Sequence, residues 1–323
     1  MNFSTQHELI ELELIKIAND CGNHSLYEPV KYILSLGGKR LRPTLTLIGC
    51  ELYGAPAERA IKAAAAFEVF HNFTLMHDDI MDKAPLRRGR PSVHQKWNAN
   101  QAILSGDAMF VISVQLIAQT EASVMPIVLG LFNRTALEVC EGQDLDMAFE
   151  TREHVSVEEY IKMIRLKTSV LVAACLSSGA IIAGASSEEA KGLYSFGENL
   201  GIAFQLRDDY LDTFGDATKI GKQSGGDILA DKKTFLLIRA LEKADENSQN
   251  KIKSMFGNTS INADTKVNII KAIFLENAVD QELVALEDLY YNRAIEALNK
   301  LEINEKGKNI LKNFAKQLME RDH

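Results

Sequence analysis

The chain has 323 residues, 46% of them hydrophobic, which is enough to build a large core. Its formal net charge is −8, and no stripe of lysine and arginine runs along it, so the composition argues against a nucleic-acid-binding protein. Only 6 Pro and 20 Gly are present, and segments rich in Ala, Leu, Ile, Glu and Lys dominate. Strand-like alternation between Asn-Gly turns is absent. Together these features predict an all-α protein.

Helical periodicity recurs along the whole chain with short breaks. Ser156 followed by Glu159, and Ser187 ahead of two glutamates, are typical of helix starts. The residues 214–230 contain four glycines and form the one long loop expected in the second half, where a functional role is common. In chain order, the expected helices are 5–20, 26–36, 40–53, 58–82, 97–120, 124–148, 156–166, 168–184, 187–213, 232–244, 262–276, 280–301 and 304–320.

Neither a leader nor a membrane span is expected. The residues 1–13 are polar and acidic and lack the basic patch and apolar stretch of a signal peptide. The longest uncharged run, 168–187, is diluted by Ser, Ala and Gly, which favours a buried helix over an integral membrane segment. The cysteines lie far apart without a Cys-x-x-Cys pair, which is typical of thiols in a reducing compartment; they are Cys21, Cys50, Cys140 and Cys175. We therefore expect a cytoplasmic protein.

Two long apolar segments end in the same acidic pattern. The first closes on Asp78-Asp79-Ile-Met-Asp82, and the second, 130 residues later, closes on a further D-D-x-x-D. Aspartates four apart share one helix face about 5 Å apart, where they repel each other and the helix dipole disfavours anions. One copy fits an exposed acidic helix end, whereas two copies indicate a shared purpose. If the two ends face each other, their carboxylates suit Mg²⁺, which binds one or two carboxylates and substrate phosphates. The second motif comprises Asp208, Asp209 and Asp212.

Basic residues occur in several short clusters along the chain. In Gly37-Gly-Lys-Arg-Leu-Arg-Pro43, Lys39 and Arg42 can share a helix face while Arg40 points elsewhere. Each cluster alone is most simply a solvated surface, but beside two acidic motifs the pattern indicates two anionic groups bound at once. No dinucleotide or Walker A glycine pattern is present, so a nucleotide is not expected. The remaining clusters are Arg87-Arg88-Gly-Arg90, Lys167-Thr168, Lys222 and Lys232-Lys233-Thr234.

From about residue 30 to 240, these motifs resemble the trans-isoprenyl diphosphate synthases, also called polyprenyl synthetases. The resemblance includes Gly142-Gln143-Asp-Leu-Asp146, similar to the family's G-Q-x-x-D, and keeps the family's order. It implies a single all-α domain, residues 1–323, with about ten core helices around a deep apolar cavity and usually a homodimer. It also implies short-chain synthesis from isopentenyl diphosphate and an allylic diphosphate, namely dimethylallyl, geranyl or farnesyl diphosphate.

The resemblance also assigns roles to individual residues. Three magnesium ions would be ligated by Asp78, Asp82 and Asp208, with support from Asp79, Asp209, Asp212 and Asp146. Isopentenyl diphosphate would be held by Lys39, Arg42, His71 and Arg88. The allylic diphosphate or its developing cation would contact Arg87, Lys167, Thr168, Gln205, Lys222 and Lys232.

Three assignments keep alternatives open. His77 competes with His71, although the spacing of seven residues before Asp78 favours His71. Asp231 stands where many members have Gly, and both following lysines are candidates, with Lys232 preferred. In this family the residues upstream of the first motif form the floor of the elongation cavity. Here these are Phe70, Phe73 and Thr74, with Phe67 expected in the core, which resembles synthases making C15 or C20 products.

Two other functional classes fit parts of the pattern. A class I terpene cyclase shares the fold and the first motif, but its usual second motif is of N-S-E type, and it needs no site for isopentenyl diphosphate. A non-catalytic subunit of a heteromeric synthase usually loses one aspartate motif, whereas this chain keeps both. A helical scaffold with acidic helix ends leaves the paired motifs unexplained. The sequence therefore favours the synthase.

Overall fold

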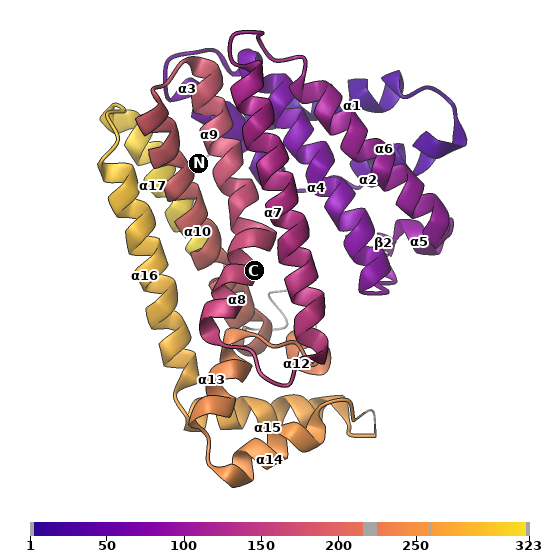
Figure 1. Ribbon diagram of the computed structural model, residues 1–323, viewed down its shortest axis with the longest axis vertical. Coiled ribbons are helices and arrows are strands. Elements are labelled where there is room, and N and C mark those ends of the chain that lie inside the picture. The colour runs from indigo at the N-terminus through magenta and orange to yellow at the C-terminus, as the bar shows by residue number, and fades with distance from the viewer. Residues whose placement is uncertain (1–2, 216–224, 259, 321–323) are drawn as a thin grey trace. The chain divides into compact units, whose positions relative to one another are not determined.

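The computed structural model describes residues 3–215, 225–258 and 260–320 (Figure 1). It confirms the all-α fold, with one small antiparallel hairpin in the described part, β1 (Leu86–Arg87) with β2 (Arg90–Pro91). The long helices are α1 (Ser4–Asp20), α2 (Glu28–Ser35), α3 (Leu41–Glu51), α4 (Ile61–Met81), α6 (Ala99–Ile117), α7 (Met125–Thr151), α8 (Val157–Ile164), α9 (Val170–Ala183), α10 (Ser187–Phe214), α13 (Phe235–Lys243), α14 (Glu246–Met255), α15 (Ala263–Glu276), α16 (Val279–Asn299) and α17 (Glu305–Met319). Shorter helical turns are η1 (Ser25–Tyr27), η2 (Ala57–Ala60), α5 (Val93–Lys96) and α12 (Gly226–Leu229).

Most expected helices occur within a few residues of their predicted ends, because their apolar periodicity is strong. Between α8 and α9 the predicted break is a π-helical turn, Arg165–Ser169, so the helical path is continuous there. Helix α14 was not predicted, because its mostly polar sequence buries only Ile252 and Met255. Its start carries a clear signal, since the Asp245 side chain accepts a hydrogen bond from the Ser248 N–H at 2.7 Å.

The chain divides into two compact units. The first unit comprises Met1–Thr135, Ala174–Tyr194 and Glu302–Asn304. The second comprises Ala136–Ala173, Ser195–Leu301 and Glu305–His323. Helices α7, α9 and α10 each run from one unit into the other. The expectation of a single domain stays a prediction.

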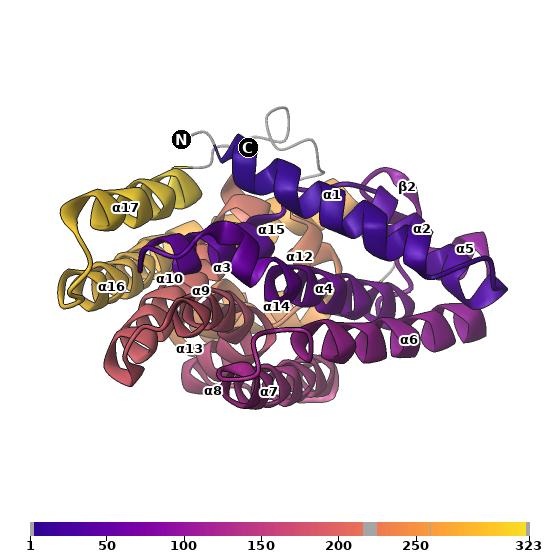
Figure 2. The same ribbon diagram turned by 90° about the horizontal axis from the view of Figure 1, so that it is seen from above.

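In the first unit, α4 lies alongside α6 and is also in contact with α1 and α3 (Figure 2). The four consecutive alanines at 63–66 are fully buried, which lets neighbouring helices approach this end of α4 closely. Towards its other end the buried side chains become aromatic and polar, with Phe70 and Asn72 in the interior. The packing of α4 therefore fixes the position of its last turn, which holds the first aspartate motif.

The core of the second unit is built from α8, α10, α13, α15 and α16. Its fully enclosed residues include Leu206, Leu236 and Leu283. Helices α14 and α15 lie side by side in Figure 1, and α15 also contacts α12. This core fixes the end of α10, which carries the second aspartate motif.

Two stretches are apolar and long enough to cross a membrane by length and composition alone, Ala99–Ile117 and Val157–Ala183. In the second stretch, 72% of the most apolar window is buried inside the protein. The burial of this stretch, which includes most of the residues 168–187, is what a core helix shows.

Candidate active site

In the first aspartate motif only the outer two carboxylates face outward. Asp78 is half-buried and Asp82, at the helix end, is exposed, whereas Asp79 is only 1% exposed. Arg87 donates to Asp79 from Nε at 3.1 and 3.2 Å and from Nη2 at 2.5 Å. Such bidentate arginine–carboxylate contact is strong and directional. Arg87 thus neutralises the middle aspartate, and the motif presents Asp78 and Asp82 as its outward pair.

The hairpin after this motif positions Arg88. In the two-residue turn between β1 and β2, Arg88 has φ 53° and Gly89 has φ 74°, the left-handed pair typical of tight hairpins. The Arg88 guanidinium lies against Gly38, where an added Cβ would come within 2.8 Å of Nη2. The glycine at position 38 is therefore required for Arg88 to approach the Lys39 segment.

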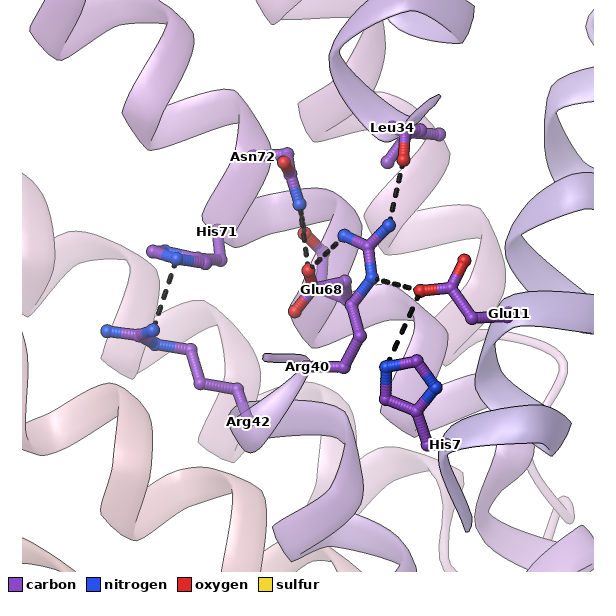
Figure 3. A network of polar contacts seen from close by, with 8 residues as sticks. All are labelled: His7, Glu11, Leu34, Arg40, Arg42, Glu68, His71 and Asn72. Atoms are coloured by element: carbon purple, nitrogen blue, oxygen red, sulfur yellow. Dashed lines mark hydrogen bonds and ion pairs between the residues drawn. The ribbon is translucent and has the colours of Figure 1, made fainter. Parts of the chain in front are cut away.

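Arg40 is a buried structural residue (Figure 3). It is 3% exposed and has φ 46°. Its guanidinium donates to Glu11 Oε1 and Glu68 Oε1, each at 2.7 Å, and to the Leu34 carbonyl at 2.8 Å. Asn72 adds a further hydrogen bond to Glu68 Oε1 at 3.1 Å. The expectation that Arg40 points away from its basic neighbours is thereby met, and its charge is neutralised by carboxylates in the interior.

Arg42 points the other way, towards His71 (Figure 3). Its Nη1 lies 3.1 Å from His71 Nε2. Because arginine can only donate, Nε2 must carry the lone pair and the imidazole proton must be on Nδ1. Burial and the nearby Arg42 and Arg88 charges hold the pKa of His71 well below its usual range, so the ring is neutral at neutral pH.

One hydrogen-bond donor of Arg42 in this cluster has no partner among the described residues. This donor is Nε, which is buried. Burial lowers the pKa of Arg42, and burial together with Arg40 lowers that of Arg88. Crowded cations with an orphaned buried donor are poorly compensated, and an anionic oxygen would satisfy both the charge and the donor.

His77 is held elsewhere. Its Nε2 contacts the Ile103 carbonyl of α6 at 3.2 Å, and its ring stacks edge-on with Phe73 at 4.7 Å between centroids. A Cβ at Gly106 would come within 2.2 Å of the same Nε2, so α6 and His77 are in close contact. Of the two candidate histidines, His71 is the one placed beside the basic cluster.

The expected chain-length residues belong to an aromatic cluster of the first unit. Phe73 lies 5.5 Å from Phe70 and 5.8 Å from Phe110 between ring centroids, and Phe70 also packs on Phe132 at 5.4 Å. Thr74 donates its hydroxyl to the His71 carbonyl at 2.8 Å, within the helix. Phe67 is fully buried, as expected for a core residue.

The second aspartate motif repeats the arrangement of the first. Asp208 is exposed and Asp212 half-buried, while Asp209 is 5% exposed. Tyr160 donates its hydroxyl to Asp209 Oδ2, and Gln205 donates to Oδ1 at 3.1 Å. Burial, with Asp227 nearby, raises the pKa of Asp209 to about 8, so the carboxyl is mostly protonated at neutral pH. Again, the middle aspartate turns inward.

A cavity of about 110 Å³ in the second unit gathers several predicted residues on its wall. Lys167 donates to Asp146 Oδ2 at 2.6 Å, and Thr168 donates to Gln205 Oε1 at 3.3 Å. Both belong to the π-helical turn, and a Cβ at Gly142 would come within 2.3 Å of the Lys167 backbone nitrogen. The glycine of G-Q-x-x-D therefore lets α7 meet this turn. The predicted residues on the wall are Asp146, Lys167, Thr168, Gln205, Asp209 and Lys232.

The two candidate lysines after Asp231 differ in their contacts. Lys233 donates to the Phe149 carbonyl at 2.8 Å, which commits its ammonium group to the backbone. Lys232 also lines the cavity, and its backbone N–H donates to the Asp227 carbonyl at 3.0 Å. Both lysines line the cavity, and the preference for Lys232 stays a prediction. Lys222 lies outside the described residues.

The comparisons with known proteins agree with this geometry. A model of the family described as polyprenyl synthetase matches residues 23–273. The chain belongs to the polyprenyl synthetase family. A geranylgeranyl diphosphate synthase of Sulfolobus acidocaldarius is 39% identical over 283 residues, covering 85% of this chain and 84% of that protein. The protein is thus a prenyltransferase of the trans-prenyl chain-elongating type.

Solved structures of polyprenyl synthetases share the whole fold. A crystal structure of a geranylgeranyl pyrophosphate synthase matches with a TM-score of 0.94 and 44% identity over 99% of each chain. A geranylgeranyl pyrophosphate synthase from Corynebacterium glutamicum, complexed with isoprenyl diphosphate and magnesium, matches with a TM-score of 0.89 and 26% identity. That match covers 99% of this chain and all of the other. These matches show the all-α isoprenoid synthase fold and so confirm the fold implied by the family resemblance.

The outward carboxylates of this polyprenyl synthetase fit a divalent cation. Each motif offers two acidic side chains on one helix face, Asp78 with Asp82 and Asp208 with Asp212. Hard oxygen donors in pairs match the few protein ligands that Mg²⁺ takes beside substrate phosphates. Within the described residues, no three His, Cys, Asp or Glu side chains gather closely enough to bind a metal by themselves. That the two acidic helix ends face each other stays a prediction.

Several residues beside these motifs escaped the sequence-based assignment. Tyr160 and Asp227 surround Asp209, Glu68 holds Arg40, and Phe110 and Phe132 complete the aromatic cluster. Glu68 could have been noticed as a carboxylate in an otherwise apolar run, one turn before His71. The others sit in ordinary helical patterns and carry no local signal.

Proposed function

We propose that this polyprenyl synthetase joins isopentenyl diphosphate to an allylic diphosphate head to tail (1′-4), with magnesium, giving a trans-prenyl diphosphate of C15 or C20. The allylic partner is dimethylallyl, geranyl or farnesyl diphosphate. The observation that carries the proposal is the arrangement of the two aspartate motifs. Each buries its middle carboxyl, while its first and last aspartates are half-buried or exposed and share one helix face.

The isopentenyl diphosphate is bound by the basic cluster of the first unit. Arg42 offers its buried Nε, and Arg88 lies against Gly38 in the segment that carries Lys39. Neutral His71, with its proton on Nδ1, adds a donor without adding charge. Such a cluster binds a diphosphate without needing a metal, because arginine forks match phosphate oxygens.

The allylic diphosphate is bound through the aspartate motifs and the cavity wall of the second unit. Asp78, Asp82 and Asp208 would hold three magnesium ions, with Asp212 in support, and the ions would supply positive charge that favours departure of the diphosphate. Lys167 and Lys232 add positive charge on the wall of the cavity. Thr168 and Gln205 place polar oxygens beside them, suited to a developing allylic cation.

The chemistry then follows from charge and from exclusion of water. As the diphosphate leaves, the allylic carbon becomes cationic, and the double bond of isopentenyl diphosphate attacks it. Apolar surroundings keep water from quenching this cation. The departing diphosphate accepts the final proton. The basic side chains hold both diphosphates in place, so that the double bond lies next to the allylic carbon. Holding the two reactants in this geometry raises the rate.

The test uses the purified chain with isopentenyl diphosphate, magnesium and each of the three allylic diphosphates in turn, with products identified by mass. A C15 or C20 diphosphate that disappears when a chelator is added supports the proposal. A cyclic hydrocarbon would instead indicate a terpene cyclase, and no product would indicate a partner-dependent subunit. A product of C25 or longer would contradict the proposed chain length.

Chain length is assigned to Phe73, with Phe70 and Thr74 beside it. We expect Phe73→Ala to lengthen the product by at least one C5 unit, because removing the ring opens space in the aromatic cluster of α4 and α6. Phe67→Ala is the control, since Phe67 is fully buried and should alter stability alone. Product mass spectra measure both. An unchanged product from Phe73→Ala would remove Phe73 from this role.

We also propose that the enzyme is a cytoplasmic homodimer without an integral membrane segment. All four cysteines are free thiols, as suits a reducing compartment. Helix α6 exposes Ile103, Leu104 and Val111, each more than 40% accessible. Large apolar side chains repeated on one exposed helix are typical of a surface that a partner covers.

A further inference from the structure

The residue before Lys232 has a backbone shape that normally calls for glycine. Asp231 has φ 56°, in the left-handed region. Glycine adopts this conformation freely, which accounts for the Gly that many family members have there, while aspartate tolerates it better than most residues. Aspartate at this position therefore introduces a side chain where none is required for the turn.

The Asp231 carboxylate is fully engaged. Oδ1 forms an ion pair with Lys266 of α15, and Oδ2 accepts the Gly257 N–H at 2.8 Å. Lys266 is only 5% exposed, and its ammonium also lies 5.7 Å from the centre of the Phe256 ring. A lysine this deeply buried needs a carboxylate partner, so the pair is a fixed contact and not a surface coincidence.

Backbone hydrogen bonds connect this pair to the second aspartate motif. The Lys232 N–H donates to the Asp227 carbonyl at 3.0 Å, and the Asp227 N–H donates to Asp212 Oδ2 at 2.9 Å. Asp212 also receives the Gly225 N–H on its carbonyl oxygen at 2.7 Å. The turn formed by residues 225–232 is thus attached to Asp212 at one side and to Lys266 at the other.

Helix α15 presses on both ends of the same turn. Val267, the neighbour of Lys266, packs so closely on Gly225 that an added Cβ would lie 2.7 Å from its Cγ2. Lys266 holds the other end through Asp231. A turn fixed at both ends by one helix has little freedom to rotate the side chain that follows it.

We propose that Asp231 and Lys266 are a positioning pair that keeps Lys232 at the wall of the 110 Å³ cavity. The inference rests on the proposed function, in which Lys232 contacts the allylic diphosphate. Neither member of the pair touches the substrate. The pair orders Lys232 before the substrate arrives, so its loss weakens binding of that one diphosphate.

The test starts from Asp231→Gly, which allows the same left-handed backbone and removes only the carboxylate. We expect a roughly three- to tenfold rise in KM for the allylic diphosphate, because Lys232 is less ordered before binding, with KM for isopentenyl diphosphate unchanged. Calorimetry with inorganic diphosphate and magnesium should show the same weakening. Asp231→Asn, which keeps the acceptor for Gly257, should give a smaller rise and serves if the glycine variant does not fold.

Lys266→Met should reproduce the allylic KM change, and the double variant with Asp231→Gly should add little, as for two members of one contact. The control is Lys243→Met, which breaks the ion pair of Lys243 with Glu282 in the same unit and should leave both KM values unchanged. The inference is overturned if Asp231→Gly leaves the allylic KM unchanged, or raises both KM values alike. If the wild-type protein elongated nothing, the proposed function would fail, while weaker inorganic diphosphate binding by Asp231→Gly would still support the pair.

Discussion

Neighbouring residues of one type have opposite fates in this enzyme. Arg40 and Arg42 are two residues apart. Arg40 forms a buried ion pair with Glu68, whereas the buried Nε of Arg42 has no partner among the described residues and suits an anion. The left-handed backbone at Arg40 separates them, and it is stabilised by carboxylates that are far away in sequence. Charge at a site is therefore set by partners and not by the local count of basic residues.

The Arg40–Glu68 pair should matter for stability. We expect Glu68→Gln to lower the free energy of unfolding by about 3 kcal/mol, because it leaves a buried guanidinium without the buried one of its two carboxylate partners. Urea unfolding measures the change. Glu121→Gln, which breaks the exposed pair with Arg59, is the control and should cost much less. Equal costs would show that the buried pair has no special role.

His71 should make stability depend on pH. Its pKa in the folded protein lies well below the ordinary value of 6.5, so the unfolded chain binds more protons below that pH. The folded state should therefore lose up to about 1.4 kcal/mol per pH unit below 6.5, and this loss should be absent from His71→Gln. Denaturant unfolding of the substrate-free proteins between pH 5 and 8 compares the slopes. Identical slopes would mean that His71 titrates normally.

At the scale of elements, glycines decide where helices can touch. In α7, Gly142 lies against the π-helical turn that carries Lys167 and Thr168, while Gly130 on the same helix meets nothing within 4 Å. The same residue type thus serves a contact in one place and merely weakens the helix in the other. The glycine that makes the contact, Gly142, is the first residue of the G-Q-x-x-D pattern.

Exchanging each glycine for alanine should separate these roles. Gly142→Ala should destabilise the protein by about 1–3 kcal/mol and lower kcat, because its Cβ displaces the turn that holds Lys167. Gly130→Ala should stabilise it by about 0.5–1 kcal/mol with kcat unchanged. Thermal unfolding and steady-state kinetics measure both. A Gly142→Ala enzyme with normal kcat would show that the turn can move without harm.

The sequence predicts the long helices well, since their apolar faces repeat over many turns. It fails for α14, whose helix rests on a capping aspartate and two buried side chains. At the site, the acidic helix ends can be recognised in the sequence because closely spaced aspartates are unfavourable at a helix C-terminus. The basic clusters can be recognised because they accompany these motifs. The inward turn of Asp79 and Asp209 is not, because Arg87 and Tyr160 become partners only in the folded chain.

At the scale of the whole molecule, the exposed apolar residues of α6 predict self-association. We expect the purified enzyme to sediment as a dimer, and Leu104→Glu to shift it towards a monomer by placing a charge on that surface. Leu12→Glu is the control, since Leu12 is equally apolar and exposed but lies on α1. Sedimentation velocity at micromolar concentration distinguishes the species. A dimer that tolerates Leu104→Glu but not Leu12→Glu would place the interface on α1.

The buried middle aspartates also limit how much negative charge each motif offers to a bound cation. With Asp79 matched by Arg87 and Asp209 mostly protonated, each motif offers two negative charges where its letters suggest three. If magnesium binds as proposed, one divalent ion would neutralise such a pair, and a third ion would have to draw its counter-charge from the substrate. Full ion loading would then depend on occupancy by a diphosphate. The free enzyme would avoid a surplus of bound positive charge, and the last ion would leave with the departing diphosphate.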